Sequence, residues 1–501
     1  MKFSICMLAC AAALSAAAGD ADVKASARSL FGEGVFVFSP EDSAAEIDRV
    51  VEGVFKKQHH RQFGEDRYAF LFLPGDYTKT KAINIGYYTQ LLGLGRLPTD
   101  VKLTNVKTPA ALDKNNATCN FWVGIENVSI VDPDNNGDPF FGFQWAVSQA
   151  APARRLHVAR KSFFDWFYGW ASGGFVADCV FEKGAGSYSQ QQYFYRNNAF
   201  GAELFGINWN QVVVGCSGDF ASKSKDNSGT PLSRCEPVSG EGVSSNWRAG
   251  GCSTLVESTS VMREKPFLFV DRGAFKVFVP AVRRNAKGVS WGEGRANGGM
   301  GEGEILDLAS RFHVARSGKD SSKTLNAALA AGKNILFSPG VYRLAEPLRV
   351  TRAGTVLLGI GEATLVPENA DAALRCADVD SLVVAGLVFD AERASRRFVV
   401  LGDKKGAASH AKSPSFLIDT VYRVGGTGKP GKTEVCLEIN SNDAVVDHTW
   451  IWRADHGAHT GWNSNTSKNG IVVNGDRVTC FGLFVEHFQE HDVLWNGEDG
   501  R

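Results

Sequence analysis

The same short pattern occurs twice in this sequence, far apart along the chain. A Pro-Gly-x-Tyr element begins at Pro74 and again 265 residues later at Pro339. The segments LLGLG and LLGIG begin at Leu91 and, 266 residues later, at Leu357. Because two separate motifs keep nearly the same offset, the sequence indicates an internal duplication. The chain has 501 residues, so each of the two related halves is long enough to enclose its own hydrophobic core.

Both halves consist mainly of short segments with alternating apolar side chains, separated by Gly, Asn and Asp. Examples are FWVGIENVSIVDP, SGGFVADCVFEKG, DSLVVAGLVFDA and NDAVVDHTWIWR. Helical periodicity is clearest at residues 43–55 and 321–332, each just before one copy of the repeated pattern. Strands without crossover helices exclude a doubly wound sheet and a TIM barrel. Irregular turn spacing favours a parallel β-helix over an antiparallel sandwich.

The predicted fold class is therefore all-β, with two tandem parallel β-helix domains. Residues 20–250 are expected to form the first domain and residues 306–501 the second, joined by a linker at residues 251–305. The linker contains FLFVD and FKVFVP, which predict a β-hairpin, and a Gly-rich segment. Since side chains fill the interior of such a fold, chemistry must come from outward-facing residues that align on successive coils.

Residues 1–19 have the pattern of a secretory signal peptide. A lysine at position 2 precedes an apolar run from about Ile5 to Ala18, which ends in small residues. The run is too short to span a bilayer, and no later segment reaches the roughly 18 consecutive apolar residues of a transmembrane helix. The protein is therefore expected to be secreted, extracellular or periplasmic, without membrane contact once the signal is removed.

The charge balance argues against nucleic acid or an anionic membrane as a partner, because 54 Lys and Arg residues offset 54 Asp and Glu residues. Eight of the ten cysteines follow the signal peptide, without a CxxC pair or a zinc spacing, so no metal and no cofactor are predicted. A monomer is expected. One disulfide is possible among three cysteines that lie close in sequence, Cys216, Cys235 and Cys252. Three others are expected to be small core residues: Cys376, Cys436 and Cys480.

Two groups of outward-facing polar and aromatic residues are candidates for a binding site. Aromatic rings pack against the C–H faces of sugars, while amides and carboxylates bind their hydroxyl groups, and both groups contain this mixture. The first group comprises Gln190, Gln191, Gln192, Tyr193, Arg196, Asn197, Trp209 and Asn210. The second comprises His448, Trp450, Trp452, Arg453, Asp455, His456, Glu486, His487 and Trp495.

Spacing alone leaves other interpretations of both groups open. The glutamine run could form a purely structural ladder along the β-helix, and the Asp-His pairs could simply satisfy one another. A metal site is less favoured, because HTWIWRADH alternates faces without a recognised ligand spacing. The segments GLGRLPT and GIGEAT suggest nucleotide loops, but neither opens a helix, so both are predicted to be turns that end strands.

Six ordered motifs resemble glycoside hydrolase family 55, from about residue 35 to residue 501. They are GWASGGFVADCVFEKGAGSYSQQQYFYRNN, WNQVVVG, MREKPFLFVD with VFVPAVRR, LFSPGVYRL, DHTWIWRADHG and GLFVEHFQEHDVLWNG. The resemblance implies a secreted exo-β-1,3-glucanase built from two tandem right-handed β-helices. It also implies a cleft between the halves for the non-reducing end of a β-1,3-glucan. The implied mechanism is inverting: a glutamate protonates the departing glycosidic oxygen while water attacks the opposite face of the sugar.

The resemblance also implies roles for individual residues. Gln190 and Gln192 match the amide pair that orients the attacking water, and Glu486 falls in the Val-Glu-His motif beside the reacting sugar. These three are the predicted catalytic residues. Trp450 or Trp452 would offer a stacking surface, and the remaining members of the two groups are predicted to bind substrate.

Two features depart from the family pattern. Val214 occupies the position expected for a further water-binding serine, on the coil after the glutamines. The general acid is expected one coil after Glu486, which falls past Arg501, so the second domain is predicted to be incomplete at its C-terminal end.

Two other functions stay open at this point. A polysaccharide lyase on the same fold would need a Ca²⁺ site, for which Asp447, Arg453 and Asp455 are the available residues. A non-catalytic β-glucan-binding protein would keep the binding surface and lack the serine and the acid.

Overall fold

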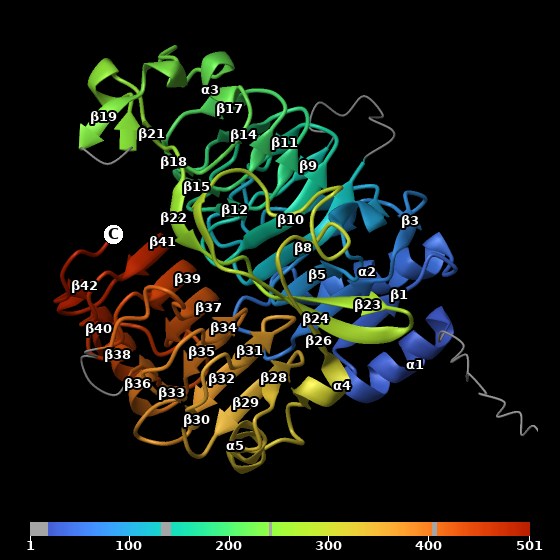
Figure 1. Cartoon of the computed structure of the whole chain (residues 1–501), viewed down its shortest axis with the longest axis vertical. Helices are drawn as coiled ribbons and strands as arrows, with labels where there is room; N and C mark the ends of the chain where they lie inside the picture. Colours follow the sequence, from blue (N-terminus) through green and yellow to red (C-terminus); the bar gives the residue numbers. More distant parts are fainter. Residues whose placement is uncertain (1–18, 132–141, 240–242, 403–407) are drawn as a thin grey trace, which may run out of the picture.

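The computed structural model describes four parts of the chain: residues 19–131, 142–239, 243–402 and 408–501. The predicted signal peptide lies outside the described residues up to residue 18. Figure 1 shows two bodies of stacked strands side by side, the first coloured blue to green and the second orange to red. Among the described helices, none is long and apolar enough to cross a membrane.

The first body is a stack of coils whose strands pair in parallel with those of the next coil, except at its far end. In the described residues its larger sheet has fifteen strands, along the path β1 (Val35–Phe38), β2 (Tyr68–Phe72), β5 (Thr89–Gly93), β8 (Val123–Ile130), β10 (Pro152–Val158), β12 (Phe175–Ala177), β15 (Gln192–Arg196), β18 (Asn210–Val214), β21 (Ser253–Val256), β20 (Val243–Ser245) and β19 (Glu236–Ser239), with β3 (Gly75–Tyr77), β6 (Val101–Leu103), β13 (Val180–Phe181) and β16 (Ala199–Phe200) beside it. At the far end β19, β20 and β21 pair antiparallel with one another. A second described sheet follows the order β17 (Leu204–Ile207), β14 (Ala185–Tyr188), β11 (Ser162–Phe163), β9 (Phe143–Gln144), β7 (Val106–Lys107) and β4 (Ile83–Asn84).

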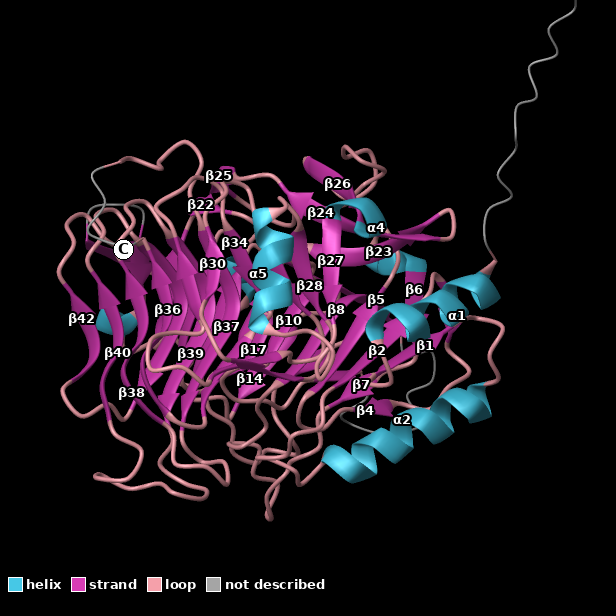
Figure 2. Ribbon diagram, turned by 90° about the horizontal axis from the view of Figure 1, so that it is seen from below, coloured by secondary structure: helices cyan, strands magenta, loops and turns pink. Residues whose placement is uncertain are grey.

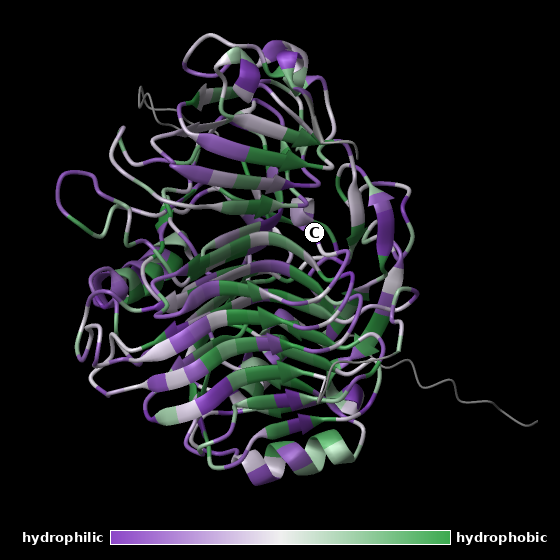
Figure 3. Cartoon of the chain, turned by 90° about the vertical axis from the view of Figure 1, so that its left-hand side faces the viewer, coloured by the Kyte–Doolittle hydropathy of each residue, from purple (hydrophilic) through white to green (hydrophobic). Residues whose placement is uncertain are grey.

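Inward side chains of successive coils stack on one another in the first body. The strand register pairs Phe70 with Leu91, Leu91 with Ile125, and Ile125 with Ala153. None of these four side chains is more than 1 % exposed. Figure 3 shows hydrophobic positions of neighbouring strands lying next to one another in this way. Each coil therefore buries its apolar face against the next coil, which is how such a stack gains its stability.

The second body repeats this construction. Its larger described sheet contains β27 (Phe312–Ala315), β28 (Asn334–Phe337), β31 (Val356–Gly359), β34 (Val383–Ala385), β37 (Phe416–Val424), β35 (Val388–Ala391), β32 (Thr364–Pro367) and β29 (Val341–Leu344), with β39 (Val445–Arg453) and β41 (Thr479–Glu486) continuing from β37. Its other sheet runs β30 (Leu348–Val350), β33 (Leu374–Cys376), β36 (Ala394–Leu401), β38 (Lys432–Ile439), β40 (Ser467–Val473) and β42 (His491–Trp495). The predicted β class, with parallel pairing of successive coils, is confirmed.

Two small antiparallel sheets connect the bodies. One pairs β22 (Thr259–Met262) with β25 (Arg283–Ala286), and the other has β24 (Ala274–Pro280) between β23 (Phe267–Asp271) and β26 (Gly303–Asp307). The short helix α4 (Leu308–Arg311) follows. Leu268 and Val277 of the connection pack in one cluster with Leu92 of the first body and Leu358 of the second. The connection is thus part of the boundary between the two bodies, as Figure 1 also shows.

The two helices predicted from the sequence are confirmed as α2 (Ala44–Gln58) and α5 (Ser322–Ala330). Each begins after a serine, Ser43 or Ser321, whose hydroxyl accepts a backbone N–H of the first turn. Ile47 of α2 and Leu325 of α5 lie in the cores of their respective bodies. Figure 2 shows both helices on the outside of the strands. The remaining helical segments are α1 (Asp20–Phe31), α3 (Phe220–Lys223), η1 (Pro98–Asp100), η2 (Leu232–Arg234) and η3 (Trp247–Ala249).

The possible disulfide is not formed in the described structure, where all eight cysteines are free thiols. The Cys216 thiol is instead buried in the first core and accepts a hydrogen bond from the backbone N–H of Asn198 at 3.4 Å. Cys376 and Cys436 are at most 1 % exposed, as expected for core residues, whereas Cys480 is half-buried.

A buried group of charged side chains joins the two bodies and the connection between them. Arg154 donates to Asp419 at 2.8 Å and to Asp447 at 3.0 Å. Arg196 donates to Asp447 at 2.8 Å and to Glu264 at 2.7 Å. None of the five side chains is more than 6 % exposed. Because a buried charge is costly without its partner, this network fixes the position of one body against the other.

Candidate active site

Two rows of side chains, one from each body, face each other across the boundary. The first-half row takes one residue from each of four successive coils: Tyr88, Trp122, Ala150 and Gly173. The second-half row likewise takes one residue from each of four strands: Val388, Val421, Trp450 and Phe484.

Aromatic rings fill the part of the boundary formed by the earlier coils. The ring centroids of Tyr88 and Trp122 are 5.1 Å apart, and those of Phe121 and Trp450 are 4.7 Å apart. Trp450 also stacks on Trp452 at 4.9 Å. None of these rings is more than 4 % exposed. The prediction that a sugar stacks on the face of Trp450 or Trp452 is therefore wrong for this structure, since other rings already cover those faces.

Beyond this aromatic cluster the boundary becomes polar. Nε2 of Gln149 donates to Oε1 of Glu486 at 2.7 Å, a contact between residues 337 positions apart in sequence. Gln149 directly precedes Ala150 of the first-half row, and Glu486 ends β41, where it pairs with Trp452. The Glu486 side chain is 31 % exposed. Its carboxylate is thus held by an amide of the other body and still reaches solvent.

The environment of Glu486 favours a carboxyl group that takes up a proton readily. Burial raises the pKa of Glu486 above its ordinary value, although nearby His487 and the N–H groups of Trp450 and Gln149 each lower it. The indole N–H of Trp450 is buried and does not meet hydrogen-bond geometry with any group of the described structure. A carboxyl group with a raised pKa in a partly desolvated position suits proton transfer.

Three exposed titratable side chains lie beside Glu486. Nε2 of His487 lies 3.9 Å from the Glu486 carboxylate and 3.6 Å from that of Asp455. Nδ1 of His456 lies 2.7 Å from Asp455. These three side chains are between 41 and 53 % exposed. Nε2 of His456 already lies 2.6 Å from the Gln62 amide, so Asp455 and His487 are the better placed to bond a bound polar molecule. The structure thus brings four predicted site residues together.

Arg453 holds the backbone beside these side chains through hydrogen bonds. Its Nε donates to the backbone carbonyl of His487, and its Nη1 donates to the carbonyl of Gly461 at 3.2 Å. Only 7 % of Arg453 is exposed. In the described structure the guanidinium fixes the backbone next to Glu486, and its predicted contact with substrate stays a prediction.

The three consecutive glutamines differ in how deeply their side chains are buried. Gln190 is 1 % exposed, and its Nε2 donates to the carbonyl of Val147 at 2.6 Å. Its predicted role in orienting an external water molecule is wrong, because the amide lies inside the coil. Gln191 is half-buried and Gln192 is exposed, with Oε1 of Gln192 3.5 Å from the hydroxyl of Ser172. Gln191 and Gln192 stay candidates for contacts with a ligand.

Three other members of the first group lie in the interior of the protein. Tyr193 stacks on Phe164 with ring centroids 4.6 Å apart, and Arg196 belongs to the buried charge network. The amide of Asn197 donates to the carbonyl of Ala286 at 3.1 Å. None of Tyr193, Arg196 and Asn197 is more than 2 % exposed. The predicted substrate contacts of all three are excluded by this burial.

Trp209 and Asn210 follow on the next coil, where Asn210 pairs with Gln192 in the strand register. Trp209 is 45 % exposed, and Asn210 is exposed as well. Their contact with a ligand stays a prediction.

Two other members of the second group lie elsewhere: His448 is buried, and Trp495 lies in a different sheet from Glu486. His448 is 1 % exposed, and its ring stacks on Phe175 with centroids 4.6 Å apart while Nδ1 lies 2.8 Å from Asp419. Trp495 lies on β42, in the other sheet of the second body, and packs against the core there. The burial of His448 contradicts its predicted contact with substrate, whereas the predicted contact of the half-buried Trp495 stays a prediction.

The residues considered for a lyase do not form one site. Asp447 is 1 % exposed and is already paired with Arg154 and Arg196, whereas the Asp455 side chain is 53 % exposed. A Ca²⁺ ion would need these oxygen atoms to converge. The lyase hypothesis loses its candidate ligands.

Gln149 and Ser172 are site residues that the sequence did not reveal. They align on successive coils, because the register that pairs Pro152 with Phe175 also sets Gln149 beside Ser172. Val214, where a serine was expected, is 4 % exposed inside β18 and lies away from this surface. Aligning the segments AVSQAAP and GWASGGF as the same corner of consecutive coils would have identified both residues.

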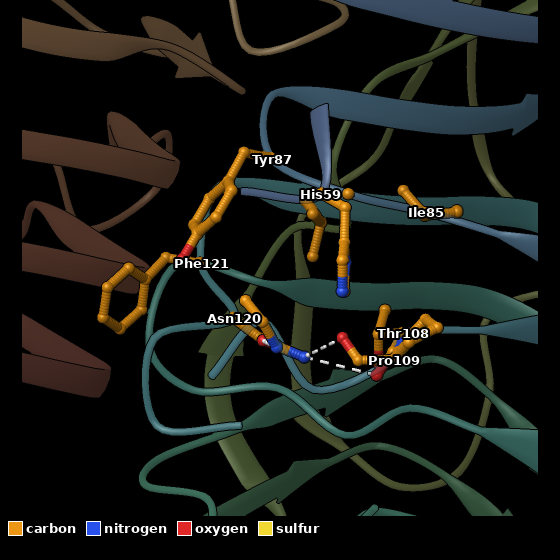
Figure 4. Close-up of a pocket in the computed structure, with 10 residues that line it drawn as sticks. His59, Ile85, Tyr87, Thr108, Pro109, Asn120 and Phe121 are labelled. Atoms are coloured by element: carbon orange, nitrogen blue, oxygen red, sulfur yellow. Dashed lines mark hydrogen bonds between the residues drawn. The ribbon is translucent and has the colours of Figure 1, made fainter. Parts of the chain in front are cut away.

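A separate cavity in the first body is too small to be a sugar-binding site. It has a volume of about 10 Å³ and is lined by residues that include His59, Tyr87 and Asn120. Figure 4 shows the Asn120 amide pointing at the carbonyls of Thr108 and Pro109, at 3.2 and 3.0 Å. Such a volume holds one water molecule and excludes a sugar.

Comparison with known proteins identifies the family. The model of the LAM55 pectate lyase-like domain matches residues 312–501. An exo-beta-1,3-glucanase from Streptomyces sp. (strain SirexAA-E / ActE) is 42 % identical over 473 residues, which cover 94 % of this chain and 71 % of that protein. The structure of sacteLam55A from Streptomyces sp. SirexAA-E has a TM-score of 0.83 at 41 % identity, covering 94 % of this chain and 78 % of that chain.

A second solved structure is a glutamate-to-alanine variant of sacteLam55A in complex with glucose, with a TM-score of 0.82 at 41 % identity and the same coverage of both chains. The relative's identity and coverage, the pectate lyase-like domain and the shared fold agree with one another. This chain is a glycoside hydrolase that belongs to glycoside hydrolase family 55.

Proposed function

We propose that this protein is an exo-acting β-1,3-glucanase that releases glucose from the non-reducing end of laminarin-like glucans with inversion at the anomeric carbon. The observation that carries the proposal is the contact of Gln149 with Glu486, which joins an amide of one body to a carboxylate of the other at 2.7 Å. The name of the Streptomyces relative and the glucose complex of sacteLam55A support the substrate class.

The catalytic pair, Gln149 and Glu486, would hold the attacking water molecule. Glu486 accepts a proton from the water as its oxygen attacks the anomeric carbon, and the Gln149 amide fixes the direction of the carboxylate. The bond from the anomeric carbon to the glycosidic oxygen breaks in the same step. Protonation of the departing oxygen belongs to a second carboxyl group, as in other inverting glycosidases.

Polar side chains around the catalytic pair would bind the sugar hydroxyls. Asp455, His456 and His487 are exposed next to Glu486, and Gln192 extends the amide surface on the other body. In this proposal the site is a cleft between the two bodies, which the buried aromatic cluster closes on one side. A cleft closed on one side by aromatic rings would admit a chain end, which is what an exo-acting enzyme requires.

We also propose that residues 1–19 direct export, so that the enzyme meets its polysaccharide outside the cytoplasm as a monomer. Export would be tested by fractionating cells that express the chain and detecting it outside the cytoplasm. Its presence only in the cytoplasmic fraction, with residues 1–19 still attached, would contradict export.

The proposed activity is tested by incubating the protein with laminarin and following the products by ¹H NMR. The proposal predicts glucose as the product, appearing first as the α-anomer and then equilibrating. Release of β-glucose would reject inversion, and release of oligosaccharides without glucose would reject the exo mode. Binding of laminarin without any product would instead identify a non-catalytic β-glucan-binding protein.

A further inference from the structure

Side-chain sizes in the two facing rows run in opposite directions. Along the first-half row the residues change from Tyr88 and Trp122 to alanine and glycine. Along the second-half row they change from two valines to Trp450 and Phe484. At the end of the rows the smallest residue of the first body, Gly173, faces the ring of Phe484 in the second. The rows pack in one cluster that contains Tyr88, Trp122, Ala150, Val388, Val421 and Trp450, with Phe484 against it.

The glycine at the end of the first-half row is not required by the backbone conformation. Gly173 has φ +78°, in the left-handed region. Tyr88 and Trp122 have φ 52° and Ala150 has φ 56° at the same corner of the preceding coils. Three residues with side chains therefore adopt this conformation in the same row, although it is unfavourable for them. The reason for glycine at position 173 must be the space around it.

That space is taken by Gln149 of the catalytic pair and by Phe484. A Cβ atom added to Gly173 would lie 3.0 Å from Cγ and 3.3 Å from Cδ of Gln149, and 3.4 Å from Cε1 of Phe484. The first two distances are shorter than ordinary van der Waals contacts, so the Gln149 side chain would have to move. Gln149 is the residue whose amide reaches Glu486, and Phe484 lies two residues before Glu486 on β41.

We propose that Gly173 is a positioning residue for the catalytic pair. Its missing side chain lets Phe484 and Gln149 approach each other from opposite bodies, and this approach places the Gln149 amide on Glu486. The inference rests on the proposed role of that pair in glucan hydrolysis. It adds that a residue without functional atoms sets the distance between the two catalytic groups.

The experiment compares Gly173→Ala, Gln149→Ala and the double variant, with glucose release from laminarin as the readout. Gly250→Ala is the control, because Gly250 has φ +84° and no atom lies within 4 Å of its added Cβ. We expect Gly173→Ala to lower kcat by about 10²-fold, the effect of a misplacement of roughly 1 Å in a catalytic group. Once Gln149 is removed, Gly173→Ala should cause little further loss, because its effect acts through Gln149. Gly250→Ala should be close to wild type.

A second readout does not depend on hydrolysis. In the wild type the side-chain amide resonance of Gln149, assigned with Gln149→Ala, should shift as Glu486 titrates, and in Gly173→Ala it should not. This NMR measurement remains informative if the wild type releases no glucose, which would reject the proposed function alone. Wild-type kcat in Gly173→Ala, equal and additive losses in the double variant, or an unchanged titration of the Gln149 amide would each overturn the role of Gly173.

Discussion

Gln149 and Glu486 come from opposite halves of the chain and meet through a hydrogen bond of 2.7 Å. Neither half alone contains this arrangement, so the site depends on the docking of the two bodies. The buried charge network and the aromatic cluster, which includes residues of both rows, hold that docking in place. Because most residues at the boundary serve this docking, only a few side chains near the site are exposed enough to contact a ligand.

The assignment of the amide partner is tested by comparing Gln149→Leu with Gln190→Leu. We expect Gln149→Leu to lower kcat/KM by about 10²-fold, because the carboxylate loses the group that orients it. Gln190 instead bonds the carbonyl of Val147 inside its coil, so Gln190→Leu should lower the melting temperature and leave activity near normal at low temperature. The reverse pattern would restore Gln190 as the site residue.

The pH profile depends on the indole N–H of Trp450. That group lowers the pKa of Glu486, which burial raises, so Trp450→Phe should raise the pKa further. Glu486 acts in its deprotonated form, and activity therefore rises with pH through its pKa. The acidic limb of kcat/KM should move to higher pH in Trp450→Phe and stay in place in Trp247→Phe, a change on the exposed η3 segment. A shift to lower pH would contradict the role of Glu486 as a base.

The buried aromatic cluster should contribute to the free energy of unfolding. Trp452 is 2 % exposed and packs on Trp450, so Trp452→Ala leaves a cavity in the boundary. We expect a loss of about 3–5 kcal/mol in the free energy of unfolding, measured by denaturant titration. The control Trp247→Ala removes a ring that is 55 % exposed, and it should change the stability by no more than about 0.5 kcal/mol. Equal stability of both variants would show that Trp452 is not packed as described.

The charge network gives a matched pair of arginine variants. Arg196→Met leaves Asp447 and Glu264 buried with fewer partners, and we expect a loss of about 3–5 kcal/mol in the free energy of unfolding. Arg311→Met removes an exposed ion pair with Glu304 and should cost no more than about 1 kcal/mol. If Arg196→Met were as stable as the wild type, the network would not fix the docking of the bodies.

The fold could be predicted from the sequence because each of its signals is local or repeats at a fixed offset. The helices at Ser43 and Ser321 have their capping residues beside them, and alternating apolar strands need only their own residues to be recognised. The disulfide considered possible is absent from the part of the chain that the structure describes, because it depends on three-dimensional geometry rather than on a local signal. Nearness in sequence does not fix thiol geometry, and Cys216 is enclosed in the core.

The site was predicted only in part, because the sequence does not show which side of a coil a residue faces once two coils dock. Asp455 follows β39 in an exposed turn and Glu486 is the last residue of β41, so both reach solvent and stay candidates. Arg196 of the first body and Trp452 of the second have side chains typical of a sugar site, yet each is buried against the opposite body. Gln149 was missed because its partner lies 337 residues away. The register of the coils, which pairs its neighbours with those of Ser172, comes from three-dimensional packing.

The most direct test of the central claim uses an activated substrate, 2,4-dinitrophenyl β-D-glucoside, whose leaving group departs without a proton. Glu486→Gln is compared with the wild type and with Glu490→Gln, a control whose carboxylate is exposed beside Lys468. If Glu486 activates water, Glu486→Gln should lose at least about 10²-fold in rate on this substrate and on laminarin, while Glu490→Gln retains both activities. A Glu486→Gln variant that hydrolyses the activated glucoside at the wild-type rate would contradict this account.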